Sequence, residues 1–315
     1  ALKYDNGRLI SINDWDQSGS RHDIAILMFE NDKLKTHVGA AYNQDESKLF
    51  GNSYRYNANN YKSLGILWLN YKFSDVIKGG IIGIADGKQK NTSDNAIYVR
   101  RTYGGNLIYD NKKTNISLYA YHQSGMLPTH QSVNAYYINP EFSLKVSDIT
   151  LTLGNEFISG RYNDTIYKES KVFNLLYGSG HDFLGYLDYF TPSNLSNQTL
   201  YCGMNTSYFK YKHDINDKLN YSLHYYYFNT KAAIYDNIRQ KDRDKYLGSE
   251  MDFVISYNYS DEVNIMFGYS AIFANNTLSY IHNTTKDFGH FCYFTFTVKP
   301  NFFNQTTSLP SLNKE

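Results

Sequence analysis

Prolines, cysteines and long apolar runs are all scarce in this chain of 315 residues. Five prolines, and no stretch rich in proline, glycine and serine, argue against a linker and for a single domain. No run of about 18 apolar residues is present, which excludes an ordinary transmembrane helix. The two cysteines, Cys202 and Cys292, fall on segments that are not expected to pair, so no disulfide is expected.

The chain has no large excess of positive or negative charge, since its formal net charge is only +1. Nucleic-acid-binding domains are usually basic, so no nucleic-acid partner is expected. Aromatic residues, in contrast, make up 17% of the chain, with 32 tyrosines and 19 phenylalanines. Tyrosine suits a membrane interface because its ring is apolar and its hydroxyl is polar. A composition bias from an AT-rich genome is the alternative explanation.

Strand-length segments with alternating polar and apolar residues recur along nearly the whole chain. In residues 250–259, Glu250 and Asp252 fall on one parity and Met251 and Phe253 on the other. Successive side chains of a strand point to opposite faces, so one face suits lipid and the other suits water. The pattern predicts strands at 1–10, 23–30, 34–43, 61–73, 76–86, 96–109, 114–124, 133–146, 148–158, 199–213, 218–229, 247–259, 262–274 and 288–299.

The predicted connections alternate between short and long. Short polar turns are expected near Asn31, Ser74, Asn111, Ser147, Ile215 and Ser260, and long polar connections at 44–60, 87–95, 125–132, 159–198, 230–246 and 275–287. Outer-membrane barrels have short periplasmic turns and long outer loops. We therefore predict an all-β fold, a transmembrane antiparallel up-and-down β-barrel over residues 1–303 with about 14 strands here, and a short tail at 304–315. The segment 1–10 is short and holds Asp5 and Gly7, so it makes a poor closing strand.

Four places in the sequence resemble the alginate export family of outer-membrane barrels. They are YDNGRLI at 4–10 with DWDQ at 14–17 and RHD at 21–23, LLYGSGHDF at 175–183 with LDYF at 187–190, LGSEMD at 247–252, and TVKPNFF at 297–303. This resemblance implies an 18-stranded barrel that conducts polysaccharides or small solutes, with about four strands preceding residue 1. The chain departs from the family in having only eight arginines, and in having Asp182 where the motif suggests lysine. Both departures argue against alginate as the solute.

The connection 159–198 is too rich in aromatic residues for a solvated loop. Long loops with apolar residues of their own usually pack against something. We expect this one to fold into the lumen and to bring His181, Asp182 and Asp188 near the wall. An outer cap, or a further hairpin in the wall, is the alternative.

Charged residues on the polar parity are the other candidates for lining a pore. Glu250 and Asp252 share a face, and Arg8, Arg21 and Arg100 are expected to oppose them. Fixed charges in a narrow aqueous path set ion preference. A structural lattice of ion pairs that stiffens the wall is the alternative, and both can hold together.

The predicted function is a porin-like channel in the bacterial outer membrane, passing small solutes or saccharides. The partners expected are outer-membrane lipid and, as an open question, other outer-membrane proteins. A barrel plugged by its own loops or by a partner is the second hypothesis. An outer-membrane hydrolase is the third, although no nucleophile motif such as G-x-S-x-G is present. No catalytic residue, metal site or cofactor is expected.

Overall fold

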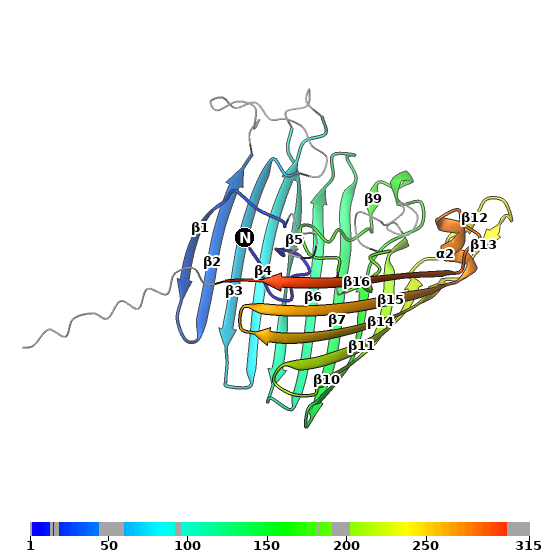
Figure 1. Cartoon of the computed structure of the whole chain (residues 1–315). Helices are drawn as coiled ribbons and strands as arrows, with labels where there is room; N and C mark the ends of the chain where they lie inside the picture. The colour runs from blue at the N-terminus through cyan, green and yellow to red at the C-terminus, as the bar shows by residue number, and fades with distance from the viewer. Residues whose placement is uncertain are drawn as a thin grey trace, which may run out of the picture.

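One large antiparallel sheet dominates the computed structural model, which describes residues 2–12, 15, 19–43, 60–91, 96–181, 183–190 and 202–300. Consecutive strands along the chain are neighbours in the sheet, in the order β1-β2-β3-β4-β5-β6-β7-β8-β10-β11-β14-β15-β16 (Figure 1). The all-β, up-and-down prediction is confirmed. The sheet is strongly curved, and β1 and β16 are its two edges, which do not pair with each other in the described part of the chain.

The long strands match most of the predicted segments to within a few residues. They are β1 (Ala25–Glu30), β2 (Leu34–Tyr42), β3 (Ser63–Lys72), β4 (Ile77–Lys88), β5 (Tyr98–Asp110), β6 (Thr114–Met126), β7 (Ser132–Val146), β8 (Ile149–Ile158), β10 (Met204–Asp214), β11 (Leu219–Thr230), β14 (Tyr246–Ser260), β15 (Val263–Ala274) and β16 (Phe288–Val298). The small elements are η2 (Asp164–Ile166), β9 (Glu169–Ser170), β12 (Tyr235–Asp236), β13 (Lys241–Asp242) and α2 (Asn276–Ile281). Neither described helix has the length and apolar character that crossing a membrane requires.

The short turns share a device that the sequence encodes. Asn31, Asn111 and Asn216 each accept hydrogen bonds through Oδ1 from the two backbone amides two and three residues ahead, at 2.6–3.1 Å. An asparagine that bonds its own backbone in this way fixes a tight turn and thereby the register of the hairpin. The predicted alternation of short and long connections holds along the sheet except between β6 and β7, where the connection predicted to be long is only residues 127–131.

The two faces of the sheet differ as the alternation predicted. Met251 is 46% exposed, whereas Glu250 and Asp252 on either side of it are 0% and 1% exposed. The convex face presents large exposed apolar side chains, including Leu27, Leu67, Ile81, Leu107, Leu118, Leu153, Leu223, Phe267 and Phe294. A continuous apolar band of this kind is typical of a surface that faces lipid.

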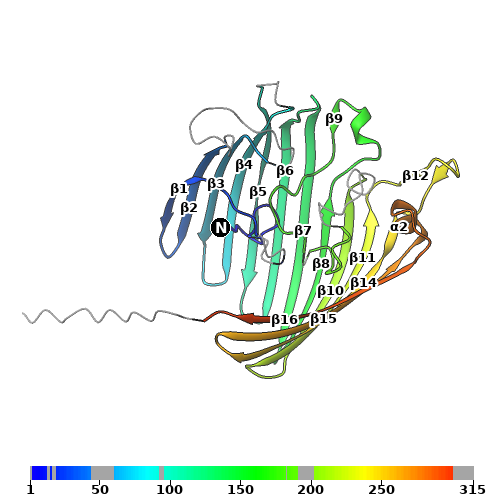
Figure 2. The same ribbon diagram turned by 45° about the horizontal axis from the view of Figure 1, so that its top comes forward.

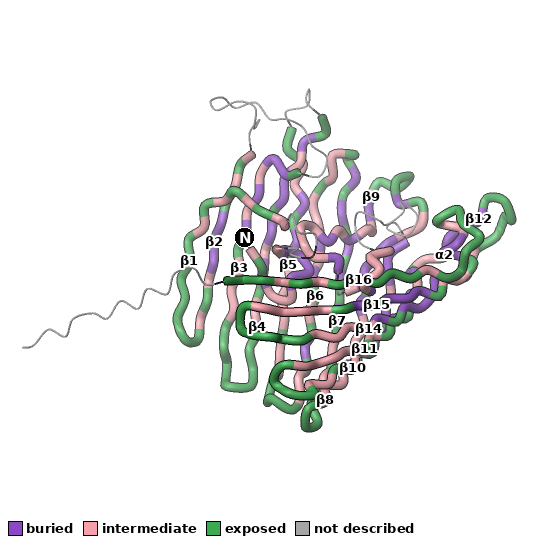
Figure 3. The backbone as a smooth tube through the Cα atoms, viewed as in Figure 1, coloured by how far each residue is buried: buried purple, intermediate pink, exposed green. Residues whose placement is uncertain are grey.

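Two coil segments lie on the concave side of the sheet (Figure 2). We call residues 2–12 the N-terminal segment and residues 173–190 the inward segment; Asp182 lies outside the described residues. Buried residues gather where these segments meet the sheet (Figure 3), and Ile10, Phe173 and Phe190 are at most 1% exposed.

The predicted strand at 1–10 is wrong. Gly7 N donates to Tyr4 O at 2.8 Å, and Asp5 and Gly7 have positive φ angles of 52° and 81°, so the chain turns back on itself. Glycine adopts such angles without strain, which is why the turn forms here. Only Ile10 makes a bridge, to Tyr177 of the inward segment. The predicted tail at 304–315 lies outside the described residues, and Cys202 and Cys292 are both free.

Candidate functional site

Backbone hydrogen bonds join the N-terminal segment to the inward segment. Tyr177 N donates to Leu9 O at 3.0 Å, Ser11 N to Tyr177 O at 3.1 Å, and Ser179 N to Gly7 O at 3.1 Å. A Cβ atom at Gly178 would collide with the backbone of Arg8, so the approach requires glycine there. The two segments therefore form one unit on the concave side.

Arg8 ties this unit to the wall of the sheet. Its side chain is fully buried, and Nε and Nη2 donate to Oε1 and Oε2 of Glu156 on β8 at 2.6 and 3.0 Å. Nη1 donates to Ser179 O at 2.7 Å, and the guanidinium lies 4.6 Å from the ring centre of Phe183. A two-pronged ion pair of this type fixes orientation as well as position.

Asp5 provides a second attachment of the N-terminal segment. Trp68 Nε1 on β3 donates to Asp5 Oδ1 at 2.9 Å, and the Tyr121 hydroxyl on β6 donates to Asp5 Oδ2 at 3.4 Å. Burial raises the pKa of the Asp5 carboxyl, while the hydrogen bonds from Trp68 and Tyr121 act in the opposite direction. The N-terminal segment is thus held to β3, β6 and β8, and the Tyr4 hydroxyl also lies 3.1 Å from His37 Nδ1 on β2.

The inward segment binds the acidic pair of β14 through its backbone. Leu187 N donates to Glu250 Oε1 at 2.8 Å, and Tyr186 N donates to Asp252 Oδ2 at 3.2 Å. Gly185, with φ +86°, packs so closely that a Cβ atom there would lie 2.5 Å from the Glu250 carboxylate.

His181 lies between two aromatic rings at the same place. Its ring stacks on Trp15 with a centre-to-centre distance of 4.0 Å, and on Tyr186 with a distance of 4.7 Å. His181 Nδ1 lies 3.1 Å from both carboxylate oxygens of Asp188. The structure therefore brings together four of the predicted residues, His181, Asp188, Glu250 and Asp252, through the inward segment and β14.

The three predicted arginines lie elsewhere. The structure does not place them opposite Glu250 and Asp252 as expected. Arg8 pairs with Glu156, and Arg100 pairs with Asp86 of β4 at 2.7 Å. Cross-strand register decides the second pairing, because Asp86 is directly opposite Arg100 on the neighbouring strand. Arg21 is exposed in the coil before β1.

Trp15 and Gly185 belong to the site although neither was a predicted site residue, and Tyr186, one of the aromatic residues of 159–198, belongs to it as well. The signal for Gly185 was weak, since nothing local shows that a glycine must adopt a positive φ beside a carboxylate. Glu156 could have been identified from the sequence as a candidate residue of the concave face. It stands on the polar parity of its strand, as the only acid on that face of β8.

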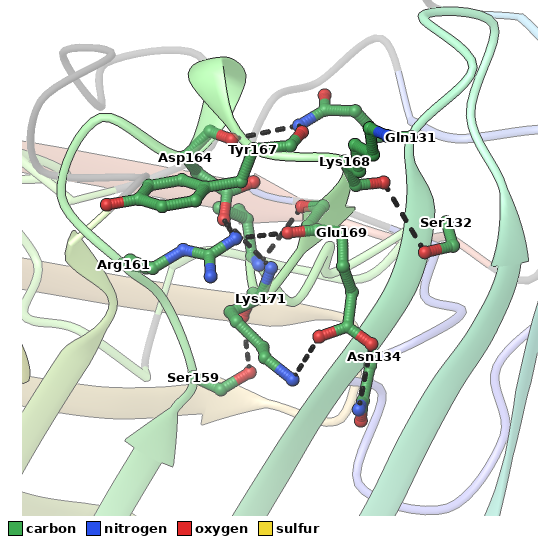
Figure 4. Close-up of polar contacts among 12 residues, drawn as sticks. Gln131, Ser132, Asn134, Ser159, Arg161, Asp164, Tyr167, Lys168, Glu169 and Lys171 are labelled. Carbon is green, nitrogen blue, oxygen red and sulfur yellow. Dashed lines mark hydrogen bonds and ion pairs between the residues drawn. The ribbon is translucent and has the colours of Figure 1, made fainter.

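A polar network fastens the chain where it leaves β8 (Figure 4). β9 pairs with the start of β7 in parallel, and Gln131 Nε2 donates to the carbonyls of Asp164 and Tyr167 at 2.8 and 2.9 Å. Arg161 bonds the Glu169 carbonyl and the Asp164 carboxylate, and stacks on the ring of Tyr167. This network fixes the point from which the chain turns inward.

Replacing Gln131 by leucine should loosen that attachment. The substitution leaves two carbonyls without their donor, at a cost of about 1–3 kcal/mol for the local structure. We expect faster proteolytic cleavage within 159–172 in intact cells or in reconstituted vesicles, followed by mass spectrometry of the fragments. Gln240→Leu, in the exposed turn between β12 and β13, is the matched control and should leave the cleavage rate unchanged. Equal rates for both variants would contradict the assignment.

Two neighbouring cavities lie between the inward segment and the short turns. The larger, about 740 Å³, is lined by residues of both charges, including Lys3, Asp5, Lys35, Lys78 and Asp110. The smaller, about 250 Å³, shares Lys78 and Tyr119 with it and reaches Phe183 and Glu156. In the described part of the chain, no group of three His, Cys, Asp or Glu side chains is arranged to hold a metal ion.

Comparison with known proteins places this geometry in a recognised architecture. No protein-family model matches the sequence, and no curated protein matches it significantly. Solved structures do match, among them the outer membrane protein OprD from Pseudomonas aeruginosa, with 13% identity and a TM-score of 0.55 over 86% of this chain and 67% of that one. The chain has the fold of these outer-membrane porins.

Two further structures agree with that likeness. OccAB4 of Acinetobacter baumannii has 14% identity and a TM-score of 0.50, and the match covers 85% of this chain and 62% of that chain. OpdK of Pseudomonas aeruginosa, solved with vanillate, has 11% identity and a TM-score of 0.53, over 87% of this chain and 66% of that chain. The present chain thus spans somewhat less than two thirds of the length of OccAB4. At this level of identity, the likeness concerns the fold.

Proposed function

We propose that this protein forms a channel in the bacterial outer membrane and passes small solutes or saccharides. Three observations support the proposal. The convex face of the sheet is apolar and aromatic, the buried charged side chains lie on the concave face, and the fold is that of outer-membrane porins. Mixed charge along the cavities suits a polar solute, and it offers no arginine-lined path for a polyanion such as alginate.

The site at β14 is the proposed constriction. The observation that carries this proposal is the docking of the inward segment on Glu250 and Asp252, because it places the chain and the acidic pair together on the concave face. Charged groups at the narrowest part of an aqueous path control which ions pass. Asp188 adds a carboxylate beside the pair, so we propose a preference for cations.

Neutralising the acidic pair tests this assignment. Glu250→Gln combined with Asp252→Asn should remove most of the cation preference, because the carboxamides keep the shape but not the charge. Reversal potentials in planar bilayers under a salt gradient measure the change. Asp148→Asn with Asp261→Asn, in two exposed short turns, is the control of equal charge. An unchanged reversal potential in the β14 variant would leave the pair a structural role only.

A plugged barrel is the second candidate, and one observation favours it. The N-terminal and inward segments pack a dry cluster on the concave side, in which Leu9, Ile10, Phe173, Leu184 and Phe190 are at most 5% exposed. Single-channel recording separates the two candidates. Stable open steps support a channel, and silence in the wild type with steps after deletion of 174–190 supports a plug.

The remaining predictions stay proposals. We keep the resemblance to the alginate export family as a hypothesis about ancestry, carried by the four sequence motifs. We propose that the protein is not an enzyme, since its structural neighbours are porins. Outer-membrane lipid is the expected surrounding.

A further inference from the structure

One row of outward-facing residues crosses four strands near the end of the sheet that carries the long connections. Ile138, Phe157, Asn205 and Asn229 are successive cross-strand partners on β7, β8, β10 and β11. Asn205 and Asn229 thus place two amides on the outward face, next to Asn155 and Ser207 of the adjacent row, where Asn155 Nδ2 donates to Ser207 Oγ at 2.8 Å. Polar side chains on the outer face of a membrane barrel cost least at the interface, so this row marks the outer rim.

Two lysines lie directly above this row. Lys231 follows β11 and Lys245 precedes β14, and the backbone between them is closed by a hydrogen bond from Thr230 N to Lys245 O at 2.8 Å. Lys231 Nζ reaches the Tyr136 hydroxyl on β7 at 2.5 Å and lies 4.4 Å from the centre of that ring. Since β8 and β10 lie between β7 and β11, this contact crosses the outer surface of both strands.

The lysines and the row enclose a groove of about 520 Å³. Its described lining contains both lysines and no acidic residue: Tyr136, Phe157, Ile158, Met204, Asn205, Asn229, Thr230, Lys231 and Lys245. Asn205 Oδ1 is buried and has no hydrogen-bond partner among the described residues. The groove therefore offers two cations, an unused acceptor and an aromatic wall.

We propose that this groove binds the phosphorylated head group of an acylated glycolipid of the outer leaflet. The lysines would pair with phosphate, and Asn205 Oδ1 would accept from a sugar hydroxyl. Below the row lies the hydrogen-bonded pair Asn155 and Ser207, and beyond that pair the exposed side chain of Leu153 begins the apolar face toward the membrane centre, where acyl chains would lie. Free phosphate would gain nothing from that apolar wall, which is why the groove favours a lipid. The site rests on the proposed membrane location but needs no open pore.

The test measures binding of lipid A to the detergent-solubilised protein by native mass spectrometry. A lysine near an anionic membrane surface contributes roughly a fivefold gain in affinity, so Lys231→Glu with Lys245→Glu should weaken binding by about tenfold to thirtyfold or more. Lipid A stripped of its phosphates should bind the wild type with a similar loss. Lys145→Glu with Lys218→Glu, at the opposite end of the strands and equally exposed, changes the charge by the same amount and should bind like the wild type.

Several outcomes would overturn the site. They are equal binding of lipid A by the two double variants, equal binding of the two lipids by the wild type, or complete displacement of lipid A by millimolar inorganic phosphate. Bilayer conductance keeps the two proposals apart. A silent wild type that still selects phosphorylated lipid A refutes the channel alone, whereas normal conductance without that selection refutes the groove alone.

Discussion

Replacing Arg8 by methionine is expected to lower the free energy of unfolding by about 3–5 kcal/mol, because it leaves the carboxylate of Glu156 buried without its counter-charge. Both side chains of this ion pair are at most 1% exposed, so water cannot substitute for the guanidinium. The same change removes the donor to Ser179 O and the partner of the Phe183 ring. Urea titration of protein refolded into lipid vesicles, followed by tryptophan fluorescence, measures the loss.

Two comparison variants make the Arg8 result interpretable. Lys72→Met breaks an exposed pair with Asp75, in which the side chains are 48% and 95% exposed, and should lower the free energy of unfolding far less than Arg8→Met does. Arg8→Met combined with Glu156→Gln removes both charges and should recover a large part of the stability. If Arg8→Met and Lys72→Met cost the same, the Arg8–Glu156 pair does not hold the N-terminal segment to the wall.

The sheet could be predicted from the sequence because each strand carries its own evidence. Alternation in 250–259 identifies β14 and its two faces, and the asparagines of the short turns identify where the hairpins bend. These are local signals, and a single strand displays them without knowledge of its neighbours. Once the strands are assigned, the lengths of the connections follow from the number of residues between consecutive strands.

The contacts on the concave side could not be predicted in the same way. Arg8 and Glu156 are 148 residues apart, and nothing near either residue in the sequence names the other as its partner. In the segment 1–10 a local pattern was present, but it indicated the wrong structure. Its apolar residues suggested a strand, yet the turn at Asp5 and Gly7 and the contact of Ile10 with Tyr177 decide its structure. Tertiary contacts override local preference wherever a short segment is buried by others.

The strongest functional effect is expected from Gly185→Val. A β-branched residue at the φ of +86° that Gly185 adopts is strained by about 1–3 kcal/mol. Its Cβ would also lie 2.5 Å from the Glu250 carboxylate, which cannot retreat into the wall. The backbone bonds from Tyr186 and Leu187 to Asp252 and Glu250 must then lengthen or break. A cost of this size changes the ratio of detached to docked segment by about 5- to 150-fold.

Detachment of the inward segment should widen the constriction and raise single-channel conductance, by about twofold or more if the docked segment is the narrowest part of the path. Gly83→Ala is the control, because a Cβ atom at Gly83 would meet nothing within 4 Å. Cation preference in the Gly185 variant should fall together with the rise in conductance, since a wider path holds the solute farther from Glu250 and Asp252. A variant with wild-type conductance and folded stability would show that the inward segment does not narrow the path. A rise in conductance with unchanged selectivity would place the charge filter outside β14.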